Sequence, residues 1–268
     1  PYYGLRDYGS DVQFGMEETP EMFVQNLVEL FREIRRALKP TGTLWLNLGD
    51  SYAGNNSQAS NNGRAGLGNP RERIINRISD GLKSKDIIGI PWMVAFALRA
   101  DGWYLRQDII WHKPNPMPES VTDRCTKAHE YIFLLSKSQK YYYDAEAVKE
   151  KSISVDIRPS ALKRSRAFGY DTKDKLIKGY SDNPNEVNRC DIAPTDRNKR
   201  SVWSVTTKPF KDAHFATFPE DLIIPCILAG CPADGVVYDP FMGAGTTAKV
   251  SLRLGRNYIG SELNPAYI

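Results

Sequence analysis

The segment "VVYDPFMGAGTT" places an apolar strand directly before a glycine-rich turn that opens a helix. Gly243 and Gly245 allow the backbone to approach a ligand closely, and the start of a helix offers N–H groups that have no partner inside the helix. Glu262 lies 23 residues after Asp239, at the end of the next predicted strand. Nucleotide-binding α/β units place a carboxylate at about this distance to bind ribose hydroxyls. The pattern therefore predicts a binding site for a nucleotide-like ligand.

The composition of the turn restricts the class of ligand. It reads GAGTT rather than GxGxxG, and it lacks the Gly-Lys-Ser/Thr of a phosphate-binding P-loop. Asp239 precedes the turn, where its negative charge would oppose a pyrophosphate. A carboxylate at this place suits a ligand with a positive or polar end, such as the amino group of S-adenosylmethionine. The alternative is a tight strand-to-helix turn that binds no ligand.

The elements that would position this turn alternate between helices and strands. A first helix is predicted with Thr19 as its cap and Pro20 as its first residue, and Pro40 and Gly42 end it. The apolar run 42–50 is typical of a buried parallel strand that opens onto a functional loop. Further helices are expected within 87–103 and 218–232, further strands within 104–114 and 130–144, and a strand–turn–helix–strand unit over 235–263. This alternation indicates an α/β protein with a mostly parallel sheet.

Composition excludes some classes of protein and locates the charge. A length of 268 residues fits one large domain or one core domain carrying an insertion. A hydrophobic fraction of 41% is ordinary for a globular protein, and no apolar run approaches the ~20 residues that span a bilayer. The four cysteines lack metal-ligand spacing, so free thiols are expected and no metal site.

Residues 150–211 carry 14 Lys and Arg against 8 Asp and Glu, whereas the whole chain has a net charge of only +4. This segment is expected to bind a polyanion, or else to form a solvated surface loop.

Several segments resemble one enzyme family. "DPFMGAGTT" resembles the cofactor motif DPFxGxGT of bacterial DNA methyltransferases that modify exocyclic amines, and "PYYGLRDYG" resembles the continuation of their catalytic motif (D/N/S)-P-P-Y. "LWLNLGDSY", "DIIWHKPNPMPESVTDRCTKAHEYIFLLSKS" and "HFATFPEDLI" are also similar to family segments, in family order. The resemblance covers nearly all of the chain outside roughly 51–84 and 150–200. The catalytic motif precedes the cofactor motif, which is the permuted order of the β class.

The resemblance implies a fold and a division of the chain. The expected fold is Rossmann-like and S-adenosylmethionine-dependent, with a mostly parallel sheet, an antiparallel terminal hairpin, a circularly permuted motif order and an inserted target-recognition region. Residues 1–149 would form the catalytic half, with a mobile loop at about 51–84. Residues 150–211 would form the basic target-recognition insertion, and 212–268 the cofactor-binding half. In the family, a strand before Pro1 carries the first two residues of the catalytic tetrad, so a preceding segment is expected.

The resemblance also implies roles for single residues. Pro1 would shape the catalytic loop, and Tyr2 would stack on a base extruded from the duplex. The cofactor-binding residues implied are Asp239, Phe241, Gly243, Gly245, Thr246, Glu262, Phe218, Pro219 and Asp50. A simple cap is an equal alternative for Asp50, and a helix start is an alternative for Phe218 with Pro219. The candidate DNA contacts are Lys113, Arg124, Lys163, Arg164, Arg166, Lys199 and Arg200.

The leading hypothesis is a DNA methyltransferase that uses S-adenosylmethionine on an exocyclic amine. Cytosine N4 is favoured over adenine N6, because the "PYYGLRDYG" continuation most often follows Ser-Pro in the family. Double-stranded DNA is the expected partner and a cognate restriction endonuclease a candidate partner. The enzyme would be a monomer or dimer, cytoplasmic in a bacterium or encoded by a phage, without membrane contact.

Two hypotheses from other classes stay open. One is a non-catalytic DNA- or cofactor-binding relative. The other is a Rossmann oxidoreductase on a doubly wound sheet, against which the composition of the turn, Asp239 and the lack of an obvious hydride-relay residue all argue. The residues ahead of Pro1 would discriminate, since Ser, Asp or Asn followed by Pro supports the enzyme.

Overall fold

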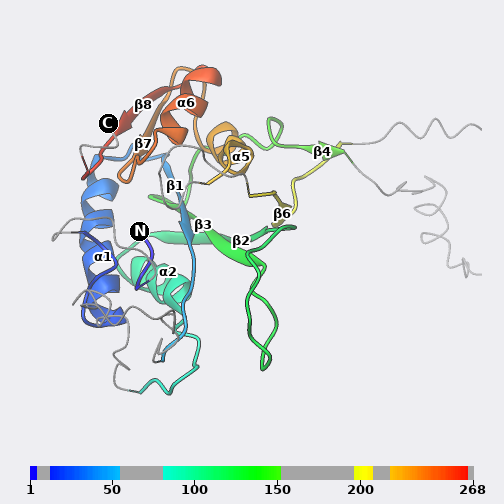
Figure 1. Ribbon diagram of the computed structural model, residues 1–268. Helices are drawn as coiled ribbons and strands as arrows, with labels where there is room; N and C mark the ends of the chain where they lie inside the picture. The colour runs from blue at the N-terminus through cyan, green and yellow to red at the C-terminus, as the bar shows by residue number, and fades with distance from the viewer. Residues whose placement is uncertain (5–12, 55–80, 152–195, 208–217, 265–268) are drawn as a thin grey trace, which may run out of the picture. The chain divides into compact units, whose positions relative to one another are not determined.

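The computed structural model describes residues 1–4, 13–54, 81–151, 196–207 and 218–264 (Figure 1). Contacts divide the chain into two units, the first formed by Pro1–Ala147 with Arg200–Ile268 and the second by Val148–Lys199. Most of the predicted mobile loop and most of the predicted basic insertion lie outside the described residues. Within the described ranges, no helix is long and apolar enough to cross a membrane.

The first unit contains a four-stranded sheet in the order β1 (Thr43–Leu48), β3 (His129–Ser136), β2 (Tyr104–His112) and β6 (Val202–Ser204). β3 runs antiparallel to both β1 and β2, and β6 runs parallel to β2. For this four-stranded sheet, the expectation of mostly parallel strands with β1 among them is therefore wrong, because its strands form a mixed sheet. A loop rather than a helical crossover joins β2 to β3, so β3 is reversed relative to β2, and β3 is also the strand that pairs with β1. These two strands form the expected antiparallel hairpin, although β6 extends the sheet beyond it.

One face of this sheet packs against α1 (Pro20–Ala37) and α2 (Ile90–Ala100). The predicted helix start is confirmed, because the Thr19 side-chain oxygen accepts a hydrogen bond from the Met22 N–H and Pro20 lies in the first turn. The strand residues of this core are Leu46, Leu48, Phe133 and Leu135. Full burial of a side chain of this size contributes about 1.5–3 kcal/mol, so the core fixes the sheet against the two helices.

The opposite face packs against α5 (Glu220–Gly230), which ends at the predicted glycine. Side chains alternate across a strand, so Ile132 belongs to this second core while Phe133 belongs to the first. The other buried members of the second core are Ile109, Trp111, Trp203, Leu222 and Cys226. Both faces of the sheet are thus covered by helices.

The predicted strand–turn–helix–strand unit is confirmed as β7 (Val236–Asp239), α6 (Thr246–Arg253) and β8 (Asn257–Gly260). β7 and β8 pair in parallel, as a helical connection requires. Ion pairs join this unit to α5, because Glu220 contacts both Lys249 and Arg253, at 2.8 and 2.5 Å.

The second unit contributes two short described strands, β4 (Glu150–Lys151) and β5 (Asp196–Arg197), which pair antiparallel. Opposite charges face each other across this pair, with Arg197 Nε 2.9 Å from Glu150 and Lys151 Nζ 2.6 Å from Asp196. Residues 202–204, placed by the sequence within the insertion, form β6 and belong to the first unit.

Candidate active site

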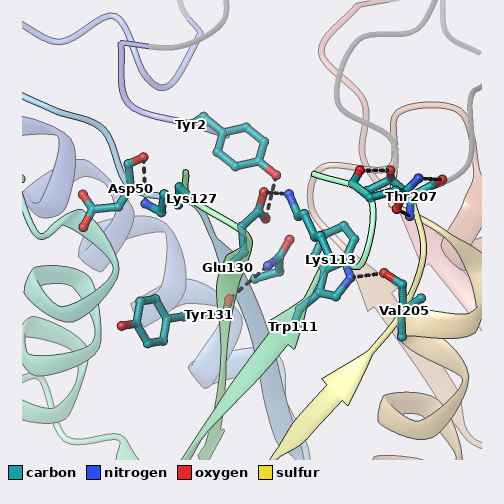
Figure 2. Close-up of polar contacts among 11 residues, drawn as sticks. Tyr2, Asp50, Trp111, Lys113, Lys127, Glu130, Tyr131, Val205 and Thr207 are labelled. Atoms are coloured by element: carbon teal, nitrogen blue, oxygen red, sulfur yellow. Dashed lines mark hydrogen bonds and ion pairs between the residues drawn. The ribbon is translucent and has the colours of Figure 1, made fainter. Parts of the chain in front are cut away.

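The Tyr2 ring lies at the end of the sheet where β1 ends and β3 begins (Figure 2). A Cβ added to Gly49 would lie 2.7 Å from Cε1 of Tyr2, so the ring rests directly on the backbone that follows β1. The Tyr2 hydroxyl donates to Oε2 of Glu130 at 3.1 Å. Tyr3 is buried and its ring centroid lies 5.4 Å from that of Phe23 on α1. Tyr3 therefore anchors the segment, while half-buried Tyr2 faces the end of the sheet.

Glu130 is shared between Tyr2 and Lys113. The Lys113 ammonium forms an ion pair with Oε1 of Glu130 and lies 4.4 Å from the centre of the Trp111 ring. Glu130 and Trp111 are register partners across β3 and β2, so their side chains project from the same face. The Lys113 and Glu130 side chains are only 19% and 12% exposed. Lys113, expected to contact DNA, therefore already has a counter-charge within the protein.

Asp50 caps α2 from the loop that follows β1. Its Oδ1 accepts hydrogen bonds from the backbone N–H groups of Ser51, Gly89 and Ile90, at 3.0, 2.9 and 3.1 Å. Gly89 is the N-cap residue of α2 and has no side chain to do this. Of the two alternatives for Asp50, these contacts support the cap.

Lys127 lies beside this loop and donates from Nζ to the Asp50 backbone carbonyl at 3.1 Å (Figure 2). Burial lowers the pKa of Lys127, and the negative charges of Asp50 and Glu130 oppose that shift. The loop 113–128 between β2 and β3 is thus held at both ends. Lys113 at its start pairs with Glu130, and Lys127 near its end bonds to the loop that follows β1.

The Asp239 carboxylate organises the glycine turn. Its Oδ1 accepts from the Phe241 N–H at 2.9 Å, and its Oδ2 accepts from the Thr247 hydroxyl at 2.5 Å. Gly245 adopts φ 75° as the N-cap of α6, a left-handed conformation that favours glycine. Thr246, the expected cofactor residue, is the first residue of α6. The threonine that bonds to Asp239 is the next one.

Glu262 lies on the other side of the same turn. Its Oε2 accepts from the Gly243 N–H at 2.7 Å, and its Oε1 accepts from the Asn264 N–H at 2.8 Å. A Cβ added to Gly245 would meet nothing within 4 Å, and one added to Gly243 would meet only the Phe241 carbonyl, at 3.9 Å. The turn is thus open at these two glycines, and two carboxylates contact it. These residues fit S-adenosylmethionine, which carries an amino group, hydroxyls and a positive sulfur, better than they fit a phosphate-bearing ligand.

Phe14 and Phe241 connect the segment that carries Tyr2 to this turn. Their rings meet edge to face, with centroids 5.8 Å apart and an interplanar angle of 83°. Gly15, the next residue, is fitted against Tyr2, because a Cβ there would lie 2.3 Å from the Tyr2 carbonyl oxygen. The structure therefore brings the segment that carries Tyr2 close to the glycine turn.

The remaining predicted cofactor residues lie on the α5 side of the sheet. Phe218 is half-buried and packs against the second core, and Pro219 is the N-cap residue of α5. These placements support the helix-start alternative for the two residues.

The predicted DNA contacts fall into three groups. Arg124 pairs with Glu119 at 2.5 Å and lies 4.0 Å from the centre of the Tyr52 ring. Lys199 is half-buried at the end of the second unit, and Arg200 is exposed at the start of the returning chain of the first. The third group, Lys163, Arg164 and Arg166, lies outside the described residues.

Three residues of the site were missed by the sequence analysis. Glu130 does carry a signal in the sequence. It is the one carboxylate in β3 and lies two residues before Ile132, on the same apolar face. Thr247 is the second threonine of the GTT run, and the first was selected instead. Gly49 gives no signal without knowledge that Tyr2 packs on it. In the part of the chain with described placement, no group of His, Cys, Asp and Glu side chains could hold a metal ion.

Known proteins similar to this chain are DNA methyltransferases. Over its full length the chain is 46% identical to the type II methyltransferase M.Cfr9I of Citrobacter freundii, covering 76% of that protein. It is 44% identical to M.SmaI of Serratia marcescens, also over its full length, and covers 78% of it.

Solved structures show the same fold. The PvuII DNA methyltransferase, described as cytosine-N4-specific, superposes with a TM-score of 0.60 at 16% identity, covering 98% of this chain and 73% of that one. A DNA modification methylase from Thermus thermophilus, complexed with S-adenosyl-L-methionine, gives 0.51 at 20% identity, covering 92% and 74%. The family model for DNA methylases of the N6/N4 type matches residues 1–268. The chain therefore belongs to the N6/N4 DNA methylase family.

Proposed function

We propose that this DNA methyltransferase transfers the methyl group of S-adenosylmethionine to the exocyclic amine of a base extruded from double-stranded DNA. The observation that carries the proposal is the contact of Phe14 with Phe241, which brings the Tyr2 segment to the glycine turn. A base stacked on Tyr2 and a methyl donor bound at the turn would then be neighbours within one unit. Extrusion is required because an enzyme cannot reach the reacting atom of a base inside the duplex stack.

The proposed roles follow from the chemistry of the amine. Its lone pair is delocalised into the ring, so it is a weak nucleophile and must be held in line with the methyl group. When bound, S-adenosylmethionine supplies a methyl group on a positively charged sulfur, so alignment matters more than acid–base strength. The Tyr2 ring holds the base by stacking, which contributes about 1–3 kcal/mol per base. Asp239 and Glu262 hold the polar ends of the cofactor, and Pro1 shapes the loop before Tyr2.

We further propose that the target is cytosine N4 rather than adenine N6. The support is the resemblance of "PYYGLRDYG" to sequences that follow Ser-Pro in the family. The test uses the full-length enzyme with unmethylated DNA and S-adenosylmethionine, followed by digestion to nucleosides and mass spectrometry. N4-methylcytosine supports the proposal, and N6-methyladenine contradicts the choice of base. No methylated base, with cofactor binding intact, contradicts the proposed reaction.

The permuted motif order and the recognition role of the insertion belong to the same proposal. The catalytic segment precedes the cofactor turn in the sequence although Phe14 and Phe241 are in contact, as a circular permutation would produce. The net positive charge of 150–211 supports DNA contact by this segment, with Arg124, Lys199 and Arg200 as further candidates. A cognate restriction endonuclease in a bacterial cytoplasm is the expected cellular setting, by analogy with the type II relatives.

A further inference from the structure

The Lys113–Glu130 ion pair lies in a largely buried place beside Tyr2. It lies at the end of the β2–β3 hairpin beside Tyr2, and both side chains are largely buried. Removing two charges from water costs about as much as their attraction returns, so such a pair adds little net stability compared with apolar side chains of similar size. The location of the pair is therefore better explained by what it positions than by net stability.

The Tyr2 hydroxyl is the group that the pair holds. One oxygen of Glu130 accepts from Tyr2 at 3.1 Å, and the other is neutralised by Lys113, which in turn lies over the Trp111 ring. A hydrogen bond to a charged acceptor is roughly twice as strong as one between neutral groups. The ammonium of Lys113 pairs with the Glu130 carboxylate, and the Trp111 ring lies against Lys113.

The ring is thus constrained at two points. Its edge rests on the Gly49 backbone, where no side chain fits, and its hydroxyl is fixed by Glu130. A tyrosine attached to the chain only through its Cα would otherwise turn about its side-chain bonds, and a base stacked on it would turn as well. Because methyl transfer depends on alignment, fixing the ring lowers the entropic cost of reaching the reactive arrangement.

We propose that Glu130 is a positioning residue that sets the orientation of the base-stacking ring of Tyr2, with Lys113 as its charge partner rather than a DNA phosphate contact. This inference rests on the proposed function, in which Tyr2 stacks on the extruded base. Glu130 acts through Tyr2 and does not itself react.

The experiment uses four variants of the full-length enzyme: Tyr2→Phe, Tyr2→Ala, Glu130→Leu and the double variant Lys113→Met/Glu130→Leu. Melting temperature, kcat and the KM values for DNA and S-adenosylmethionine are measured for each. Glu130→Leu alone leaves the Lys113 charge half-buried without a partner, so it loses stability as well as activity. The double variant removes that unpaired charge. Glu33→Gln, which breaks an exposed pair with Arg36 on α1, is the control.

The expected result is a double variant that regains a melting temperature near that of the wild type while its kcat stays about tenfold lower. Tyr2→Phe, which removes only one oxygen atom, should lower kcat to a similar degree with an unchanged KM for S-adenosylmethionine. Recovery of kcat together with the melting temperature would overturn the inference, since the pair would then only stabilise the fold.

Two outcomes separate this inference from the proposed function. If Tyr2→Phe retains wild-type kcat while Tyr2→Ala loses activity, stacking stands and the positioning role of Glu130 falls. If Tyr2→Ala also retains wild-type kcat, the stacking role of Tyr2 is wrong, and the inference falls with it.

Discussion

Phe14 packs edge to face against Phe241, 227 residues later in the chain, with ring centroids 5.8 Å apart. Phe241 belongs to the glycine turn, and Phe14 precedes the glycine that fits against the Tyr2 carbonyl. The pair therefore ties the segment proposed to bind the base to the turn proposed to bind the cofactor.

The first prediction concerns this ring pair. Phe14→Ala and Phe241→Ala should each lower the free energy of unfolding, and a double-mutant cycle should give a coupling of about 0.5–1.5 kcal/mol, the usual value for aromatic pairs. Urea unfolding of the two single variants and the double variant measures it. Strictly additive losses would mean that the two segments are not energetically coupled.

The second prediction concerns Asp239. Asp239→Ala should abolish S-adenosylmethionine binding, because it removes a carboxylate from the site and also two hydrogen bonds that shape the turn. Thr247→Val removes only the second of these bonds, so it should weaken binding by about tenfold without abolishing it. Isothermal titration calorimetry with the cofactor tests both variants. Unchanged affinity in Asp239→Ala would remove the cofactor assignment.

Local signals in the sequence predicted most of the elements but not their pairing. Thr19 with Pro20 marks the start of α1 because capping is decided within one turn of chain. The direction of β1 relative to β3 depends instead on two strands that are far apart in the sequence. A buried strand such as the run 42–50 is apolar whether its neighbour is parallel or antiparallel.

The same distinction holds for the site. Asp239 and Glu262 were predicted because the glycine turn is a local pattern, and in the structure both accept hydrogen bonds from its backbone. Glu130 and Gly49 matter through contacts with Tyr2 from 128 and 47 positions away, and spacing along the chain carries no such information. Lys113 was predicted to contact DNA, and its ion pair with Glu130 was not foreseen because Glu130 lies on the next strand.

The third prediction concerns pH. Burial, assisted by the charges of Glu17 and Glu21, raises the pKa of Tyr3 from 10 to about 12. The folded protein keeps this proton where the unfolded chain releases it, so this contribution to stability is complete below about pH 10 and is lost as the pH rises toward 12. Urea unfolding across this interval should show a steeper loss of stability in the wild type than in Tyr3→Phe. Equal slopes would contradict it, and Tyr104→Phe, at an exposed tyrosine, is the matched control.

The fourth prediction concerns the basic insertion. Charge reversal at Lys163, Arg164 and Arg166 should weaken DNA binding and reduce the slope of log K against log salt, since each lost phosphate contact removes about 0.9 from that slope. Fluorescence anisotropy with a labelled duplex at several salt concentrations measures both quantities. An unchanged slope would assign these residues to a solvated surface loop.

The fifth prediction concerns Gly49. A Cβ at this position would lie 2.7 Å from Cε1 and 3.0 Å from Cδ1 of Tyr2, so Gly49→Ala must displace the ring. The backbone at Gly49 is not in the left-handed region, so alanine introduces no strain of its own. We expect kcat to fall by about tenfold with little change in melting temperature, because the ring moves while the core beneath Tyr3 does not. The control is the same substitution made in a Tyr2→Ala background. If displacement of the ring is the cause, Gly49→Ala should have no further effect on kcat in a Tyr2→Ala background, whereas an equal loss in both backgrounds would place the effect elsewhere.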